Sequence, residues 1–394
     1  MQALYYFILV LLVGCFIQCQ SDNTSAQNLN SANALPAEET DFEVAEYKWG
    51  YMNKNGKIAI AARFDELRDF REGIAAVRIG GKWGLIDTMG NYLLVPTHKG
   101  VFSSHEGRIR YLTYDEKVGY LDRMGKVAIP AQYIDGQDFS EGLARIETEE
   151  GFGFINTVGD TIIPPQFARA SRFQGGLAKV KKRNNWGLVD RDGEFIIIGE
   201  FQKIEWPKEA LIRIKKEGQF GFLNLAGELV IPTQYRAATD FYEGVAAVCL
   251  ATTGKYGLVD QRGQAVTAFE YDKIWYANDN RWAIRADGKY GIMDGEGKVI
   301  VTPQFGQLYQ FEDGVASYEG KDRLWGLINT EGTQLTTAQF GLLWTCKEGM
   351  ARAAFREGIG FIDKAGYLRI APKRNIVDVR DFSEGFAPVQ LITQ

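Results

Sequence analysis

The stretch FGFLNLAGELVIPTQY, residues 220–235, contains the signals that decide the fold of this 394-residue chain. Asn224 and Gly227 have the spacing Asx-x-x-Gly, which is typical of a tight turn. In such a turn the Asx side chain caps backbone N–H groups, and Gly takes a positive φ. Apolar residues stand directly before the turn, at 222–223, and after it, at 229–231. The stretch therefore predicts two β-strands joined by a turn.

The same pattern recurs ten times from residue 47 onward. An aromatic or apolar residue followed by Gly marks each copy, and successive copies are 34 to 36 residues apart. Every copy has Asn or Asp three residues after that Gly and a second Gly six residues after it. The ten pairs are Trp49-Gly50, Trp83-Gly84, Val118-Gly119, Phe152-Gly153, Trp186-Gly187, Phe220-Gly221, Tyr256-Gly257, Tyr290-Gly291, Trp325-Gly326 and Ile359-Gly360. Such self-similarity at a fixed period indicates a repeat array.

A connector and a third apolar run complete each copy. Several connectors contain Phe-x-Glu-Gly, as at residues 70–73, 139–142 and 241–244. Each copy thus predicts a three-stranded antiparallel meander. A helical repeat of similar period is disfavoured, because Gly occurs at least twice per copy and β-branched residues dominate. One meander cannot bury its apolar face alone, so we expect neighbouring copies to stack.

These residues resemble the WG-repeat family, which is named for its Trp-Gly pair. The resemblance covers about 88% of the chain and rests on ten copies of the Asx and Gly pattern, although only four pairs contain Trp. It implies an all-β repeat array, often found on secreted or envelope proteins. It implies no single activity, cofactor or substrate.

Two architectures fit ten tandem repeats of this length. We expect an open superhelix or β-solenoid, in which each copy contacts mainly its neighbours. The alternative is a closed ring resembling a β-propeller. A closed ring is the less favoured of the two, because 34 residues are few for a four-stranded blade and ten copies exceed the usual four to eight blades.

The N-terminal 46 residues differ from the repeats. Residues 3–19 are uncharged and mostly apolar, short for a membrane span and typical of a signal segment. Residues 12–15, Leu-Val-Gly-Cys, resemble a bacterial lipoprotein box, so we predict that Cys15 is lipidated; Cys19 is a poorer match. Residues 20–46 read as a flexible acidic tether. The predicted organisation is a signal segment at 1–19, a tether at 20–46 and repeats at 47–394, with the protein lipid-anchored at the bacterial cell envelope.

Charge outside the tether is nearly balanced. Six of the 50 acidic residues lie in 20–46 with no Lys or Arg, which leaves 44 acidic and 45 basic residues elsewhere. Such a body has no overall attraction for nucleic acid. We therefore expect no nucleic-acid partner.

Motifs for catalysis or metal binding are not recognisable in the repeats. The Asx residues of the turns are interpreted as turn caps and not as calcium ligands. His98 and His105 fit no zinc motif and are expected at the surface. Cys249 and Cys346 are expected to be buried free thiols. One recurring set of carboxylates precedes Gly in the connectors and is interpreted as structural, because catalysis needs one asymmetric constellation: Glu72, Glu106, Glu141, Glu243, Glu348 and Glu384. We predict no catalytic residues, no metal and no cofactor.

One feature breaks the symmetry of the copies. At the position 26 residues after the first Gly, copies two to five carry a cation, at Arg110, Arg145, Lys179 and Arg213. Their neighbours in sequence are apolar, so period-two alternation places the cations on the opposite strand face. Lys181 and Lys215 extend the same face. This basic stripe is a candidate site for an acidic partner; its other interpretation is a set of solvated surface charges.

The sequence thus favours a non-enzymatic, envelope-tethered binding or scaffold protein. Long repeat surfaces suit extended ligands, so the expected partner is a protein or a glycan, which would be anionic if the basic stripe binds it, with membrane contact through the lipid anchor. The alternative is an envelope enzyme, or an accessory subunit of one, with an active site built from irregular loops.

Overall fold

The computed structural model describes residues 46–393, and these residues form strands, turns and one short 3-10 segment, Lys321–Arg323. Nine antiparallel sheets hold the ten repeats, because one six-stranded sheet takes the place of two sheets and contains strands of three copies. Among the described residues, no helix is long and apolar enough to span a membrane. The prediction of an all-β repeat fold is confirmed.

The strands follow one another in chain order. The first three sheets comprise β1 (Glu46–Asn53), β2 (Ile58–Phe64), β34 (Ile376–Val379) and β35 (Phe386–Thr393); β3 (Glu66–Leu67), β4 (Ile74–Ile79), β5 (Lys82–Asp87) and β6 (Tyr92–His98); and β7 (Gly100–His105), β8 (Arg108–Leu112), β9 (Val118–Leu121) and β10 (Val127–Tyr133). The next three comprise β11 (Asp135–Gly136), β12 (Leu143–Thr148), β13 (Gly151–Asn156) and β14 (Thr161–Phe167); β15 (Arg169–Gln174), β16 (Leu177–Lys182), β17 (Asn185–Val189) and β18 (Phe195–Gly199); and β19 (Lys203–Ile204), β20 (Leu211–Lys216), β21 (Gln219–Asn224), β22 (Leu229–Ala238), β23 (Val245–Leu250) and β24 (Tyr256–Asp260). The last three comprise β25 (Lys273–Tyr276), β26 (Arg281–Ala286), β27 (Lys289–Asp294) and β28 (Val299–Phe305); β29 (Val315–Glu319) and β30 (Trp325–Asn329); and β31 (Met350–Phe355), β32 (Gly358–Asp363) and β33 (Leu368–Ile370).

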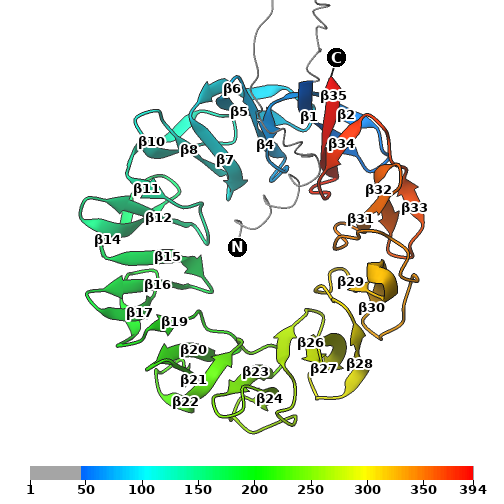
Figure 1. The fold of residues 1–394 in the computed structure, drawn as a ribbon. Coiled ribbons are helices and arrows are strands. Elements are labelled where there is room, and N and C mark those ends of the chain that lie inside the picture. Colours follow the sequence, from blue (N-terminus) through cyan, green and yellow to red (C-terminus); the bar gives the residue numbers. More distant parts are fainter. Residues whose placement is uncertain (1–45, 394) are drawn as a thin grey trace, which may run out of the picture. The chain divides into compact units, whose positions relative to one another are not determined.

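The two ends of the repeat array meet in one sheet. Strand β1 pairs antiparallel with β35 over eight residues, from Glu46 opposite Thr393 to Asn53 opposite Phe386. The sheets therefore form a closed ring, a β-propeller, as Figure 1 shows for the blue and red segments. The closed alternative is correct, and the expectation of an open superhelix or solenoid is wrong.

The blades are offset from the sequence copies. The last strand of one copy pairs with the Trp-Gly strand of the next, as β4 does with β5. Six of the nine sheets have four strands instead of the expected three, because a further strand, as short as two residues in β3, joins the edge. Since every blade combines two copies, the first blade, which contains β1 and β2, is completed by β34 and β35 of the last copy.

The turns have the chemistry that the sequence predicts. The side-chain oxygen Oδ1 of Asn224 accepts hydrogen bonds of 3.0 and 2.9 Å from the backbone N–H groups of Ala226 and Glu228. Gly227 has a φ of +82°. Asp87 caps its turn in the same way.

The Gly of the Trp-Gly pair is required by a close approach of two strands. A Cβ atom on Gly50 would lie 2.5 Å from the carbonyl oxygen of Ile60, and one on Gly84 would lie 2.4 Å from that of Leu94. The pairing register shifts at these positions. Any larger residue would therefore separate the two strands.

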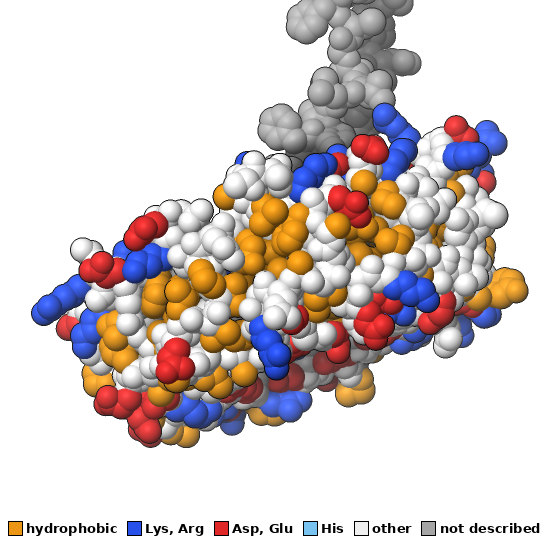
Figure 2. Space-filling view, turned by 90° about the horizontal axis from the view of Figure 1, so that it is seen from below, with side chains coloured by type: hydrophobic (Ala, Val, Ile, Leu, Met, Phe, Trp, Pro, Cys, Tyr) orange, Lys and Arg blue, Asp and Glu red, His pale blue; other side chains and the backbone are white. Residues whose placement is uncertain are grey.

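The core lies between neighbouring sheets. One cluster joins Tyr51 and Phe64 of the first sheet with Val77 and Ile86 of the second. Apolar side chains also remain exposed on strands at the edges of their sheets, and Figure 2 shows hydrophobic side chains spread among charged ones on the side of the ring that it views. Among these exposed residues are Ile196 and Ile198 of the edge strand β18. Cys249 and Cys346 are buried free thiols, as predicted, and burial raises the pKa of Cys346 to about 11.

Candidate ligand-binding face on copies two to five

The four cations of the basic stripe lie on equivalent strands of successive sheets, Arg110 on β8, Arg145 on β12, Lys179 on β16 and Arg213 on β20. All four side chains are mostly buried, with exposed fractions between 12 and 20%. They are not bare charges, because each forms an ion pair with a carboxylate. Of the two outer members, Lys215 lies over the ring of Phe220, and Lys181 has no ion pair among the described residues.

Three of these ion pairs join neighbouring copies, and two of the three, those of Arg110 and Arg213, share one geometry. Arg110 Nε lies 3.1 Å from Asp138 Oδ1, and Arg213 Nε lies 2.7 Å from Asp240 Oδ1. The second guanidinium nitrogen of each Arg donates to a backbone carbonyl, that of Gly136 or Ala238. The contacts tie a strand of one copy to the connector of the next.

A further cation at the same position was missed by sequence reasoning. Arg352 lies 26 residues after Gly326, the same spacing as the stripe, and its Nε donates to Asp381 Oδ1 over 2.5 Å. Comparing that position across all ten copies would have revealed it. The cations therefore have a structural role in several blades, and their role in binding stays a prediction.

The connector of copy four departs from this scheme. In three other connectors the carboxylate partner stands directly before a Phe, at Asp138-Phe139, Asp240-Phe241 and Asp381-Phe382. Copy four has Arg172-Phe173 there, and copy five has Trp206 at the same place. Arg145, which would face this position, pairs instead with Asp135 of its own sheet.

Lys179 also has different partners from Arg110 and Arg213, because copy five has Trp206 where their partner copies have Asp. Lys179 Nζ lies 2.7 Å from Glu205 Oε2 and 3.7 Å from the centre of the Trp206 ring. Burial alone would raise the pKa of the Glu205 carboxyl, but hydrogen bonds from Lys179 and Lys203 outweigh burial and lower its pKa. Glu205 is therefore held as an anion between two cations.

Two adjoining hollows lie at these departures from the repeat. One, of about 400 Å³, is bordered by His105, Arg110, Asp138, Arg172 and Trp206. The second, of about 350 Å³, shares Ser171 with the first and is lined by side chains of two kinds. Its cations are Arg145, Arg169, Lys179 and Lys203, and its aromatic residues are Phe152 and Trp186.

Two of these cations are accessible and unpaired. Arg169 and Arg172 are exposed and form no ion pair among the described residues. Sequence reasoning missed both. Arg172 could have been found by its charge, since it stands where four copies have Asp, whereas nothing in the sequence places Arg169 beside the hollow.

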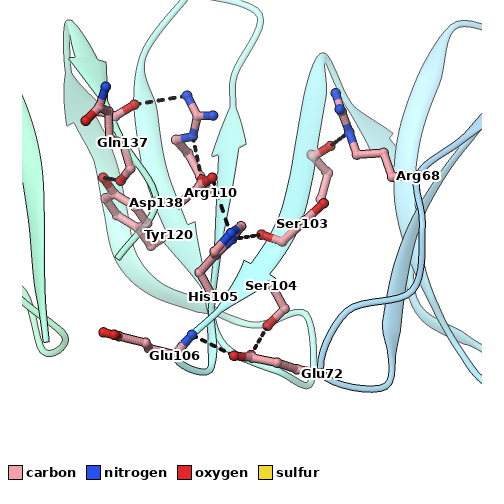
Figure 3. Close-up of polar contacts among 12 residues, drawn as sticks. Arg68, Glu72, Ser103, Ser104, His105, Glu106, Arg110, Tyr120, Gln137 and Asp138 are labelled. Carbon is pink, nitrogen blue, oxygen red and sulfur yellow. Dashed lines mark hydrogen bonds and ion pairs between the residues drawn. The ribbon is translucent and has the colours of Figure 1, made fainter. Parts of the chain in front are cut away.

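His105 and Asp138 meet at the edge of the first hollow. The ring nitrogen Nδ1 of His105 lies 3.2 Å from the carbonyl oxygen of Ser103 and 3.6 Å from Asp138 Oδ2 (Figure 3). His98 packs edge-on against Tyr111, and burial lowers its pKa. Both His residues are half-buried.

The connector glutamates form a ladder of hydrogen bonds from copy to copy. The carboxylate of Glu72 accepts from the backbone N–H groups of Glu106 and Gly107 at 2.8 and 3.0 Å, and from the Ser104 hydroxyl at 2.6 Å (Figure 3). The carboxylate of Glu106 accepts in turn from the N–H groups of the following copy. In Figure 1 the ends of β7 and β15 point toward the centre of the ring, which places the turns that follow them at its inner rim. The interpretation as structural is confirmed for Glu72, Glu106, Glu141, Glu348 and Glu384, which all accept such hydrogen bonds. It stays a prediction for the side chain of Glu243, which accepts none among the described residues.

Comparison with known proteins identifies the repeat. The model of the family described as WG containing repeat matches eight segments, at residues 49–83, 119–150, 152–186, 186–219, 220–251, 256–290, 290–319 and 359–391. No curated protein matches the sequence.

Solved structures show only distant likeness. A eukaryotic initiation factor is 12% identical with a TM-score of 0.48, over 76% of this chain and 95% of that chain. BamB from Moraxella catarrhalis is 13% identical with a TM-score of 0.34, over 74% and 96%. Kluyveromyces lactis Hsv2 is 9% identical with a TM-score of 0.33, over 67% and 96%. At such scores, no argument about function rests on these likenesses.

Proposed function

Because this chain belongs to the WG-repeat family and folds as a closed ring of its repeats, we propose that it is a non-enzymatic binding or scaffold protein. Its ligand-binding face is the pair of hollows on copies two to five, and its partner is an acidic segment of a protein. The observation that carries this proposal is the presence of two exposed, unpaired guanidinium groups, Arg169 and Arg172, beside aromatic rings at those hollows.

The chemistry of the lining supports an acidic partner. Guanidinium groups donate paired hydrogen bonds that match the geometry of a carboxylate. Trp206 and Trp186 add apolar area with a polar edge, as is common at binding surfaces. The anions at this face are already held, since Asp138 pairs with Arg110 and Glu205 with Lys179. The unpaired charge available to a ligand is therefore positive.

The test uses the unpaired cations and leaves the structural ion pairs intact. Combining Arg169→Gln with Arg172→Gln should preserve the melting temperature and abolish salt-sensitive retention on a polyglutamate matrix. Arg262→Gln is the matched control, because Arg262 is exposed and forms no ion pair in the described part of the chain. Unchanged retention of the double variant, or equal loss in the control, would refute this binding face.

An envelope enzyme remains the second candidate, and the observation that favours it is the contact between His105 and Asp138 at a hollow. A His beside a carboxylate can serve as an acid–base pair. If this candidate holds, His105→Gln abolishes turnover of a substrate that the wild-type protein converts, while retention on the acidic matrix stays unchanged.

We further propose that the protein is tethered to the cell envelope through a lipid on Cys15, which lies outside the described residues. The apolar segment at 3–19 and the Leu-Val-Gly-Cys stretch support this proposal. Cys15→Ser should move the protein from the membrane to the soluble fraction or leave the precursor uncleaved. Equal labelling of Cys15→Ser and wild type by a palmitate analogue would reject Cys15, and Cys19→Ser would then be the next variant.

A further inference from the structure

The turn that follows each connector binds a carboxylate through backbone N–H groups. In several copies both residues of the Glu-Gly turn have positive φ values, for example 57° at Glu141 and 79° at Gly142. This conformation directs successive N–H groups to one point, which is how backbone nests hold anions. The N–H groups of Glu141 and Gly142 contact the Glu106 carboxylate at 2.6 and 2.7 Å.

The same contact recurs around the ring. In every instance the acceptor is an acidic side chain of the preceding copy, with donor–acceptor distances of 2.5 to 3.1 Å. The steps run from Glu384 to Glu72 and Gly73, from Glu72 to Glu106 and Gly107, from Glu106 to Glu141 and Gly142, from Glu141 to Gly175 and Gly176, from Glu209 to Glu243 and Gly244, from Asp279 to Gly314, from Asp313 to Gly349, and from Glu348 to Gly385.

The ladder lacks its carboxylate between copies four and five. Gly175 stands where other copies have Glu, so copy four offers no acceptor to copy five. The turn of copy five nevertheless has the binding conformation, with φ values of 51° at Glu209 and 65° at Ala210. Both residues are exposed, and no described side chain accepts a hydrogen bond from their N–H groups. A Cβ atom on Gly175 would have no atom within 4 Å, so there is space for a carboxylate.

The surroundings of this vacant step are cationic. The connector that has Gly175 in place of Glu also carries Arg172 where four copies have Asp, so relative to those copies two acidic residues are missing and one base is gained. Lys208 directly precedes the turn of copy five. The anions of this connector are already engaged: the side chain of Glu209 accepts from the N–H groups of Glu243 and Gly244 of the next copy at 2.5 and 2.8 Å, and Glu205 pairs with Lys179.

We propose that the backbone N–H groups of Glu209 and Ala210 bind the side-chain carboxylate of an Asp or Glu residue supplied by a protein partner. This inference rests on the proposed function, because it names the contact by which an acidic segment docks beside Arg172 and Trp206. A polypeptide is the occupant that the molecule itself indicates, since acidic side chains of its own chain fill the equivalent place in eight of the other nine steps. In the remaining step, from copy six to copy seven, Glu243 is present but accepts no such hydrogen bond among the described residues, so only the step after copy four lacks the acidic residue itself. The partner thus supplies the carboxylate that copy four lacks.

A variant of copy four can supply the missing carboxylate from the chain itself. Gly175→Glu restores the residue that other copies have, and the positive φ of +62° at Gly175 is tolerated by Glu elsewhere, since Glu72 and Glu106 have φ values of 55° and 53°. Gly175→Gln is the matched control, because it has the same size and the same backbone cost without the charge. We expect Gly175→Glu to melt at a higher temperature than Gly175→Gln when no ligand is present.

The same pair of variants tests binding. A labelled hexaglutamate peptide should bind Gly175→Glu at least tenfold more weakly than wild type, and Gly175→Gln should bind it more tightly than Gly175→Glu. A hexaglutamine peptide should not bind, and stronger binding of a polyglucuronate fragment than of the peptide would assign the site to a glycan and refute the proposed occupant.

The outcomes separate this inference from the proposed function. Equal melting temperatures of Gly175→Glu and Gly175→Gln would overturn the inference, whatever the peptide does, because the vacant step would then not hold a carboxylate. If Gly175→Glu binds hexaglutamate as wild type does while the Arg169 and Arg172 double variant does not, the binding face stands and the docking contact is wrong.

Discussion

Glu384, in the last copy, accepts a hydrogen bond of 2.6 Å from the backbone N–H of Glu72, in the first copy, although 312 residues separate them in sequence. The hydrogen bond is one step of the carboxylate ladder, and it joins the two ends of the array a second time, beside the pairing of β1 with β35. Closure therefore uses the same contact that connects other neighbouring copies. The junction between the two ends thus needs no contact of its own kind, since it repeats a contact found between other copies.

Glu72→Gln should destabilise the ring, because Glu72 accepts three hydrogen bonds through its charge. A Gln side chain keeps one acceptor and turns a donor toward backbone N–H groups, so we expect a loss of about 1–2 kcal/mol in the free energy of unfolding. Glu149→Gln is the control, since Glu149 is exposed and outside the ladder. Urea unfolding of both variants provides the measurement, and an equal effect of the two would argue against the ladder.

Acid should weaken the ladder. Burial alone would raise the pKa of the Glu72 carboxyl, but hydrogen bonds from Ser104 and from backbone N–H groups outweigh burial and lower its pKa below the ordinary 4.5. A carboxyl whose pKa is lower in the folded state contributes stability that is complete above its unfolded pKa and is lost as pH falls through its folded pKa. The free energy of unfolding should therefore fall as pH drops below about 4.5.

The variant Glu72→Gln isolates this contribution. Its free energy of unfolding should decline less between pH 5 and pH 3 than that of wild type, and the Glu149→Gln control should follow wild type. Parallel pH profiles for Glu72→Gln and wild type would show that the carboxylate is not stabilised by folding.

The sequence predicts the local structure well, because that structure depends on neighbouring residues. Asn224 and Gly227 indicate the turn that the structure contains. Gly recurs at position 50 and its equivalents because two strands approach each other there so closely that a Cβ atom would clash with the neighbouring backbone. Closure is different: it depends on a small rotation between copies, summed over ten of them, which no single residue encodes. The ion pairs were also missed, because Arg213 and Asp240 meet only once copies are stacked.

Closure itself can be tested at β35. Val389 is fully buried opposite Gly50, and Val389→Asp would place an unpaired charge in the core beneath the β1–β35 pairing that closes the ring. We expect a loss of about 3 kcal/mol or more. Ile392→Asp, on the same strand but 43% exposed, should cost far less. Thermal melting compares the two, and similar melting temperatures would mean that the β1–β35 pairing does not contribute to the stability of the ring.

The ion pair between Arg213 and Asp240 should couple copies five and six. Both side chains are largely shielded from water, with exposed fractions of 16 and 28%, and Arg213 also donates to the carbonyl of Ala238. A double-mutant cycle with Arg213→Ala and Asp240→Ala should give a coupling free energy of about 1 kcal/mol, at the upper end for partly exposed pairs. A cycle with Arg213 and Asp160, which is not its partner, should give none. Coupling that vanishes in the first cycle would leave the stripe cations without a structural role.

Replacing Gly227 should destabilise the turn of copy six. Its φ of +82° is costly for a β-branched residue, so Gly227→Val should lower the free energy of unfolding by roughly 1–3 kcal/mol. Ala226→Val alters the neighbouring exposed position, whose only role in the turn is a backbone N–H donated to Asn224, and it should change stability little. The side chain added at Gly227 meets no backbone, since the nearest atom to its Cβ is the Ile197 side chain at 3.6 Å. A difference between the two variants therefore reports backbone strain and not a clash, and equal melting temperatures would show that a positive φ is not required there.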